Sequence, residues 1–444
     1  MKSRTAALSG WGRYPVAECA VYNPGSAGAL ADTIDGLPDA IVRGNGRSYG
    51  DASLNPAATI EALGLDRLIA FESETGTLTC EAGVLLSDII DVLLPRGWFP
   101  AVTPGTRFVS VGGAIASDVH GKNHHGAGSF CDHLDWLDLA PGDGSVLRCS
   151  REENADLFAA TCGGMGLTGA ILRAAIRLTP VESAWIRQKK VRAKSLATAF
   201  EIFEGSLDWT YSVAWIDCLA KGDSLGRSVV FLGEHARLDE LPERHRAAPF
   251  ARPSSRPKRV PIDFPGFALS RVPVTLFNAY TYASNRDGEG LADLDRYFYP
   301  LDSLLDWNRI YGRRGFMQYQ CVLPLKESEQ GIRRLLDAIT SAGSASFLAV
   351  LKRMGPASFG LLSFPMEGYT LALDFPHTPA NLALLDNLDS ITREHGGRIY
   401  FAKDSRGRRE ALAFYPGVEA FRNVRAANGL HGRVSSLMSD RLGL

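Results

Sequence analysis

The chain has 444 residues, with 48 lysines and arginines against 49 aspartates and glutamates, so its formal net charge is −1. A chain of this length can bury about three quarters of its unfolded surface and is expected to form two or three domains. Because there is no basic excess to neutralise phosphates, the composition argues against a nucleic-acid-binding role, and we expect no nucleic-acid partner.

The N-terminal segment and the cysteines favour a cytoplasmic protein. Residues 1–14 lack the apolar core of a signal peptide, and no stretch of roughly 18 residues is continuously apolar. The seven cysteines form no CxxC pair, and their odd number is not typical of a disulfide framework. We expect reduced thiols, a cytoplasmic location and, where a membrane is involved, a peripheral contact at the inner membrane.

Strand and helix signals alternate over the first 180 residues. Helical spacing of apolar residues predicts helices at 87–94 and 154–160. Short apolar runs bounded by turn residues predict strands at 39–43, 78–82, 135–139, 146–149 and 169–178.

The composition changes after residue 180. Residues 244–259 contain six lysines and arginines and no acidic residue, and with the prolines up to Pro261 this predicts a loop. Helices are expected at 327–342 and 379–395, and a strand followed by helices from 398 onward. Strands are expected at 316–323, 346–352 and 369–375. This mixed pattern predicts a second domain that contains both helices and strands.

Two glycine-rich passages carry the first functional signal. In residues 44–48 the sequence Gly-Asn-Gly-Arg-Ser follows a strand and can present successive backbone N–H groups to an anion. It does not fit GxGxxG, so a nicotinamide site is disfavoured, and a lone glycine-rich turn is more often only a turn. The second passage, 104–125, is rich in glycine and serine, which is typical of backbone that lies against a flat ligand. Together the two loops fit a long ligand with a diphosphate and a planar ring, such as FAD.

The strand predicted at 316–323 has one polar face. Period-2 alternation places Gln318 and Gln320 on one side and apolar residues on the other. An unpaired buried amide costs about 1–3 kcal/mol, so this face is expected to line a wet pocket that binds hydroxyl groups. Lys352 ends the strand at 346–352 on its polar side.

Several longer stretches resemble the flavin oxidoreductases of the vanillyl-alcohol oxidase type, the family of p-cresol methylhydroxylase. They cover nearly the whole chain: RGNGRSYGDASLNP (43–56), TPGTRFVSVGGAIASDVHGKNHHGAGSF (103–130), GGMGLTGAI (163–171), PLDSLLDWNRIYG (300–312), GFMQYQCVLP (315–324) and YFAKDSR (400–406). The GRSYG and paired-glycine elements are shared by the wider family. The GKNHH and AKDSR elements are particular to the branch that oxidises a polyprenylphosphoryl ribose.

The resemblance implies a two-domain α+β flavoprotein. Residues 1–182 plus 398–444 would form a p-cresol methylhydroxylase-type FAD-binding domain, and 183–397 a substrate cap with a mixed or antiparallel sheet flanked by helices. Some relatives bond the flavin to a histidine after a glycine pair, but here Ala114 follows that pair, so we expect non-covalent FAD. The FAD contacts implied are Arg43, Gly44, Asn45, Gly46, Arg47, Ser48, Tyr49, Gly105, Ser110, Val111, Gly112, Gly113, Ser117, Asp118, Val119, His120, Ile171 and Tyr400.

Catalysis is assigned by the resemblance to Lys403 and His120. Lys403 would bind and polarise the reacting hydroxyl or the substrate phosphate, and His120 would orient the substrate or act as base. No metal is expected, because the nearby histidines have no acidic or cysteine partner at ligand spacing. Relatives in this branch commonly carry cysteine where this chain has Ala372. The substrate contacts implied are Gln318, Gln320, Lys352, Lys403, Tyr49 and Asn308.

The implied reaction is oxidation of the 2′-hydroxyl of a polyprenylphosphoryl-β-D-ribose to the 2′-keto sugar. A partner keto-reductase would complete epimerisation to the arabinose form, a product of arabinose biosynthesis that would enter cell-wall arabinan or another glycoconjugate. The alternative is a soluble sugar, alditol or aldonolactone oxidase that uses oxygen. Those relatives carry His-Trp-x-Lys, whereas residues 400–403 here are Tyr-Phe-Ala-Lys, which favours the lipid-linked substrate. A third alternative is a flavin-binding or prenyl-lipid-binding protein without catalysis.

A polyprenyl-phosphate substrate lies in a membrane, so the basic segment 244–261 has two interpretations. It is either a solvated loop or a contact with anionic lipid through Arg252, Arg256, Lys258 and Arg259.

Overall fold

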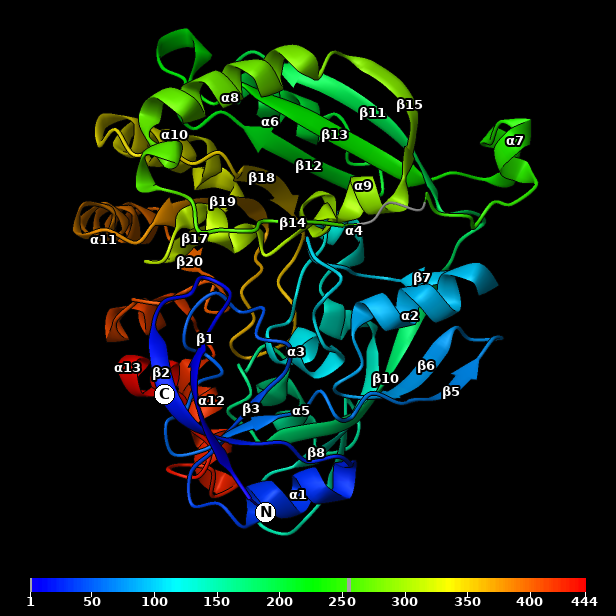
Figure 1. The fold of residues 1–444 in the computed structure, drawn as a ribbon, viewed down its shortest axis with the longest axis vertical. Helices are drawn as coiled ribbons and strands as arrows, with labels where there is room; N and C mark the ends of the chain where they lie inside the picture. The colour runs from blue at the N-terminus through cyan, green and yellow to red at the C-terminus, as the bar shows by residue number, and fades with distance from the viewer. Residues whose placement is uncertain (1, 254–256) are drawn as a thin grey trace.

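The computed structural model describes residues 2–253 and 257–444, and two sheets form its lower half in Figure 1. In the first sheet, β1 and β2 are antiparallel, whereas the β2–β4 and β4–β3 pairs are parallel. Its strands in spatial order are β1 (Arg4–Ser9), β2 (Val16–Tyr22), β4 (Thr59–Glu61) and β3 (Ile41–Arg43). β3 lies at the sheet edge, and the first glycine-rich passage begins where it ends.

The second lower sheet is antiparallel, and its strands are β5 (Leu68–Glu72), β6 (Thr77–Glu81), β10 (Ala170–Pro180), β8 (Leu134–Ala140) and β9 (Leu147–Ser150), with β7 (Trp98–Pro100) also on β10. The helices of this half are α1 (Ala27–Asp35), α2 (Leu86–Leu93), α3 (Val111–Ala116), α4 (His124–Ala127), α5 (Ala155–Thr161), α12 (Val418–Ala427) and α13 (Leu437–Leu442). Apolar side chains of β8 and β10 pack against α3 and α5, which fixes the second glycine-rich passage on the sheet.

The upper half contains one antiparallel sheet of eight strands. In order these are β15 (Gly288–Asp293), β11 (Trp185–Ala193), β13 (Ser228–His235), β12 (Tyr211–Ile216), β18 (Ala349–Met354), β19 (Gly368–Pro376), β17 (Phe316–Pro324) and β20 (Arg398–Ile399). Its helices are α6 (Leu196–Glu204), α7 (Glu243–Arg246), α8 (Arg271–Ser284), α9 (Leu294–Phe298), α10 (Leu325–Ser341) and α11 (Pro379–Glu394). A short parallel pair, β14 (Lys258–Arg259) with β16 (Leu304–Leu305), and the 3₁₀ helix η7 (Trp307–Tyr311) complete it.

The predicted alternation in β17 is confirmed. Met317, Tyr319, Cys321 and Leu323 are buried in one apolar cluster with α10 and α11. In α10, apolar side chains recur at helical spacing and face the same cluster, and each buried side chain contributes about 1.5–3 kcal/mol. The helices therefore cover one face of the upper sheet and leave the glutamine face free for a cavity.

The α+β class and the two-domain flavoprotein architecture are confirmed, whereas the exact domain boundaries stay a prediction. Strand β20 pairs with β17, so the chain adds one short strand to the upper sheet after residue 397. The expectation of a loop over 244–261 was too simple, because α7 ends inside it and β14 pairs with β16. Arg256 lies outside the described residues.

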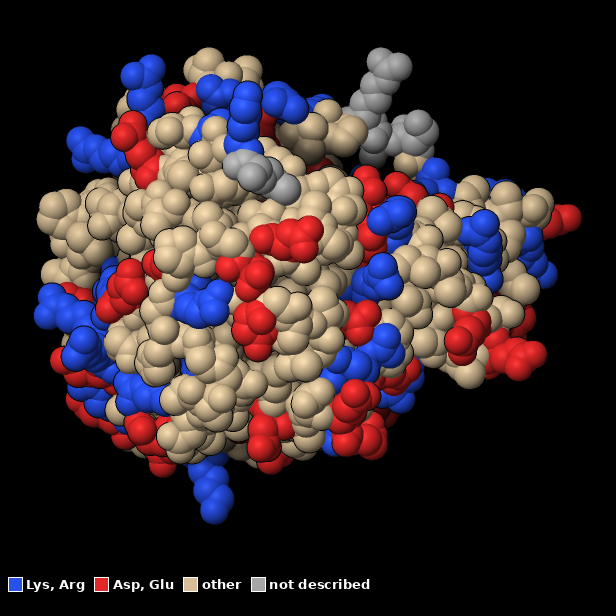
Figure 2. All heavy atoms as spheres, turned by 90° about the horizontal axis from the view of Figure 1, so that it is seen from below, with Lys and Arg blue, Asp and Glu red and all other residues tan. Residues whose placement is uncertain are grey.

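The surface and the cysteines add two observations. Figure 2 shows basic and acidic side chains interspersed over the lower face, so this face presents no field of a single sign. All seven cysteines are buried free thiols. Among the described helices, none combines the length and hydropathy needed to cross a bilayer.

Arg441 in α13 ties the C-terminal end of the chain to two segments of the lower half. Its guanidinium donates to both carboxylate oxygens of Asp51, at 2.7 and 3.1 Å, and to Asp404 Oδ2 at 2.8 Å. Both aspartates are almost fully buried. A buried carboxylate is tolerated only while it is paired, so these two depend on Arg441.

We expect Arg441→Met to lower the free energy of unfolding by about 3–5 kcal/mol, because it leaves two buried carboxylates without their cation. Urea unfolding of the holoprotein, followed by tryptophan fluorescence, measures the change. Arg237→Met is the control, since Arg237 pairs with Asp239 at the exposed surface, where an ion pair contributes little to stability. Equal effects of the two variants would contradict this account.

Candidate active site

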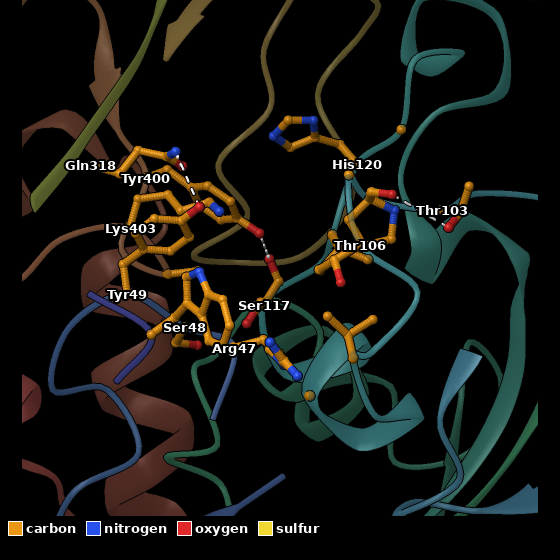
Figure 3. A pocket seen from close by; sticks show the side chains of 18 of the residues that line it. Arg47, Ser48, Tyr49, Thr103, Thr106, Ser117, His120, Gln318, Tyr400 and Lys403 are labelled. Carbon is orange, nitrogen blue, oxygen red and sulfur yellow. Dashed lines mark hydrogen bonds between the residues drawn. The ribbon is translucent and has the colours of Figure 1, made fainter. Parts of the chain in front are cut away.

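A cavity of about 570 Å³ lies between the lower sheets and the free face of the upper sheet. This is the size of a small-molecule site. In Figure 3, Tyr49, Gln318, Tyr400 and Lys403 gather on one side, and Thr103 and His120 lie on the other. Of the residues expected from the sequence, the cavity brings together Gly44, Asn45, Gly46, Arg47, Ser48, Tyr49, Gly105, Ser110, Gly112, Gly113, Ser117, Val119, His120, Ile171, Gln318, Gln320, Lys352, Tyr400 and Lys403.

The segment 44–48 forms an anion cradle in the cavity wall. Over the described chain, none of its five backbone N–H groups has an intramolecular acceptor. Gly46 has φ +61°, a conformation that favours glycine. A Cβ at Gly44 would lie 2.1 Å from Ser110 Oγ, and Ser110 caps α3. Only glycine at 44 therefore lets the two glycine-rich passages meet.

Arg47 gives this cradle a positive charge. Its guanidinium lies 4.2 Å over the Trp11 ring, and burial lowers the pKa of Arg47. Its Nε is buried and has no hydrogen-bond partner among the described residues. A half-buried cation whose buried Nε has no partner in the described chain, beside five backbone N–H groups that also lack acceptors there, is suited to a diphosphate, so the residues present fit FAD.

A second cluster surrounds Lys403. Its Nζ lies 3.9 Å from the centre of the Tyr49 ring. Gln318 Nε2 donates to Asp374 Oδ1 at 2.6 Å and to the Tyr49 hydroxyl at 3.3 Å, and Tyr311 also donates to Asp374. Burial lowers the pKa of Lys403 to about 8, while the Asp374 charge opposes that shift. Burial raises the pKa of Asp374, and its donors and Lys403 oppose the rise.

His120 belongs to a chain of hydrogen bonds that ends at Lys352. The Thr370 hydroxyl donates to the Cys321 carbonyl, so its oxygen accepts from Gln320 Nε2 at 3.2 Å. The same Nε2 lies 3.1 Å from His120 Nε2, and His120 Nδ1 lies 3.0 Å from Lys352 Nζ. Burial and then the Lys352 charge hold the pKa of His120 well below its usual range, and burial lowers the pKa of Lys352 to about 7. His120 is therefore neutral, with both ring nitrogens engaged.

Two functional candidates were missed in the sequence. Lys122 lines the cavity, donates to the Tyr297 and Phe298 carbonyls, and has a pKa that burial lowers to about 7. The GKNHH element was a signal for it. Asp374 lies on the same face of β19 as Thr370, but its role follows only from the distant Gln318 and Tyr311 that contact it.

Four residues expected in the site do not line the cavity, because each is used within the fold. The Arg43 guanidinium binds Ser53 and the Ser9 carbonyl, and Val111 packs in the core. Asp118 accepts from Cys131 N and Ser363, and Asn308 donates to the Trp11 carbonyl.

His124 and His125, which follow His120 in the sequence, each contact different partners. His124 contacts Ser129 and the Gly355 N–H, and His125 contacts the Trp209 carbonyl. Across the residues with described positions, no group of three or more histidine, cysteine or acidic side chains could hold a metal ion.

Sequence matches to known proteins extend over both halves of the chain. A family model described as "FAD binding domain" matches residues 20–150. Decaprenylphosphoryl-β-D-ribose oxidase of Mycolicibacterium smegmatis is 36% identical over 99% of this chain and 98% of its own length. An uncharacterised protein of Streptomyces coelicolor is 36% identical over 81% of this chain. L-Gulonolactone oxidase of Mus musculus is 32% identical, over only 31% of this chain and 31% of its own length. The chain is an FAD-dependent oxidoreductase and belongs to the decaprenylphosphoryl-β-D-ribose oxidase family.

Proposed function

We propose that this chain oxidises the 2′-hydroxyl of a polyprenylphosphoryl-β-D-ribose to the 2′-keto sugar. The observation that carries the proposal is the polar end of the cavity, where the half-buried Lys352 and Lys403 lie with Gln318 and Gln320. Lysines suit a phosphate, and the amides suit sugar hydroxyls. Bound FAD would accept the hydride from the substrate carbon.

The cofactor is held without a covalent bond in this proposal. Residues 44–48 and Arg47 bind the diphosphate, and the passage around Gly105, Gly112 and Ser117 lies along the rest of FAD. Ala114, which follows the glycine pair, has no nucleophile and is buried in the core. We assign FAD binding to residues 1–182 plus 398–444 and substrate binding to 183–397.

The chain's own groups handle the hydroxyl and its proton. Protonated Lys403 polarises the reacting hydroxyl, and Asp374 favours that protonated form. Gln318 donates to Asp374 through Nε2, so its Oε1 remains for a sugar hydroxyl. Lys352, whose pKa burial lowers to about 7, accepts the hydroxyl proton in its unprotonated form, and His120 Nδ1, 3.0 Å from Lys352 Nζ, positions it.

The substrate class sets the remaining parts of the proposal. A polyprenyl chain places the substrate in a membrane, so the protein meets it in a peripheral contact at the inner membrane surface. A keto-reductase must then reduce the 2′-keto sugar to complete the epimerisation. The soluble-oxidase alternative is disfavoured, because the gulonolactone oxidase match covers less than a third of the chain and residues 400–403 lack His-Trp-x-Lys.

We expect Arg47→Met to weaken FAD binding by about 10- to 100-fold, the range expected for loss of hydrogen bonds from a charged donor. Fluorescence titration of the deflavinated protein measures the dissociation constant. Arg148→Met provides the control, since Arg148 lies at the surface on Trp136. Unaltered FAD affinity in the Arg47 variant would remove Arg47 from the cofactor site.

Asp374→Asn is expected to shift the pH dependence of flavin reduction. Lysine is charged below its pKa, so a step that needs protonated Lys403 is lost as the pH rises through that value. Without the Asp374 charge, the pKa of Lys403 falls further. The alkaline limb of the plot of flavin reduction rate against pH therefore moves to lower pH by about one unit. Stopped-flow reduction at several pH values measures the limb, with exposed Glu419→Gln as control. A limb that stays in place would show that Asp374 does not act on Lys403.

The substrate is tested by anaerobic mixing of the holoenzyme with a short-chain prenylphosphoryl-β-D-ribose. We expect the oxidised flavin band to bleach with this compound and not with free ribose or an aldonolactone. Lys403→Met should retain FAD and slow bleaching by at least about 100-fold. Bleaching by the free sugar or lactone would move the chain to the soluble oxidases. Retained FAD that no compound bleaches would favour a binding protein.

A further inference from the structure

The exposed apolar residues of this protein are concentrated in one short region. Of the fifteen large apolar side chains exposed in the described chain, seven lie between residues 262 and 280. They are Ile262, Phe264, Phe267, Val272, Leu276, Phe277 and Tyr280. Single exposed apolar residues are normal, but a contiguous group marks an interaction surface.

Helix α8 presents this surface outward. Val272, Leu276 and Tyr280 are four residues apart, so they form one stripe along the helix, and their exposed fractions are 67% to 72%. Only Val274 and Asn278 on the other side of α8 are buried, and Asn278 donates to Asp217. In Figure 1, α8 lies at the top of the molecule, on the outside of the upper half.

The charges from residue 257 through α8 to Arg286 are mostly basic, and Asp287, the next residue, is paired with Arg192. Between residues 257 and 286 the sequence has Lys258, Arg259, Arg271 and Arg286 against the single acidic residue Asp263. Asp263 is already paired with Arg13 and Arg309, whereas Lys258, Arg271 and Arg286 form no ion pair with any described residue. An apolar stripe flanked by unpaired cations is complementary to an anionic lipid surface.

This region also adjoins the cavity. One apolar cluster contains Leu269, which lies just before α8, together with Phe347, Trp307 and Leu348. Phe277 of α8 contacts this cluster, because its ring centroid lies 5.9 Å from that of Phe347. Trp307 and Leu348 line the cavity. By contrast, two arginines of the basic segment are neutralised, Arg252 by Asp91 and Asp295 and Arg259 by Asp306.

We propose that α8, with residues 262–269, is the surface through which this protein lies on an anionic lipid bilayer. The proposal rests on the proposed function, because a polyprenyl-linked substrate is what requires such a contact. The apolar stripe enters the interfacial layer, and Lys258, Arg271 and Arg286 face the lipid phosphates. The cluster around Trp307 then joins the lipid-facing region to the wall of the cavity.

The test is co-sedimentation of the holoenzyme with vesicles of equal parts phosphatidylglycerol and phosphatidylcholine. We expect Leu276→Glu/Tyr280→Glu to weaken binding by at least tenfold, and Arg271→Gln/Arg286→Gln to weaken it to a smaller extent. The matched control is Val146→Glu/Leu207→Glu, which replaces two exposed apolar residues elsewhere and should bind as the wild type does. Wild-type protein should bind pure phosphatidylcholine vesicles weakly.

The proposal is overturned if the wild type does not sediment with the anionic vesicles, or if the α8 variant binds as well as the control. It is also overturned if light scattering shows that wild-type protein is a dimer that the α8 variant dissociates, since a second copy would then cover the stripe. Bleaching of the flavin by the short-chain substrate distinguishes failure of the lipid-surface proposal from failure of the proposed function. The α8 variant should bleach at the wild-type rate, and failure of bleaching in both proteins would count against the substrate alone.

Discussion

The site depends on one junction, where the turn after β3 meets the segment after β20. Tyr49 N donates to the Ala402 carbonyl at 2.9 Å, and a Cβ at Gly50 would lie 2.1 Å from the Asp404 carbonyl oxygen. Two distant parts of the chain are thus in backbone contact, and Arg441 closes the contact from α13. Because Tyr49 and Lys403 stand on opposite sides of this junction, backbone contacts position the cation over the ring.

Desolvation of three lysines suits the cavity to an anionic ligand. Lys122, Lys352 and Lys403 line it, and Asp374 is the carboxylate whose charge favours protonation of Lys403. Desolvation lowers the pKa of each lysine, so near neutral pH these side chains are only partly protonated. A phosphate beside Lys122 or Lys403 would favour the charged form of that lysine, and its binding would therefore be linked to proton uptake. A neutral sugar offers no such compensation.

The sequence predicted those parts of the site that local pattern determines. Alternation placed Gln318 and Gln320 on the cavity face, and glycine-rich turns marked both passages of the cofactor wall. The roles of Asp118 and Asn308 could not be predicted, because Ser363 and Trp11, which they contact, are far away in the sequence. The strands β11 and β15 were missed because polar residues interrupt their alternation, whereas the short apolar runs of β12 and β13 were a strand signal that was overlooked; α8 was missed because few of its residues are buried. Local sequence patterns thus determine which face of a strand is polar and where turns form. Contacts between segments that are distant in the sequence determine which polar groups reach the cavity.

A substrate with a lipid tail imposes two requirements that a soluble sugar does not. Its head must reach a buried polar cavity, where short-range electrostatics act on the phosphate, while its chain must stay in an apolar medium. The cluster of Trp307, Tyr311 and Phe316 lines the cavity through Trp307 and packs against Leu269, beside the surface that we propose meets the lipid. Its rings are closely packed, with Tyr311 and Phe316 stacked at 4.1 Å. In the proposed lipid contact, this aromatic wall would set the distance between the lipid surface and the cavity.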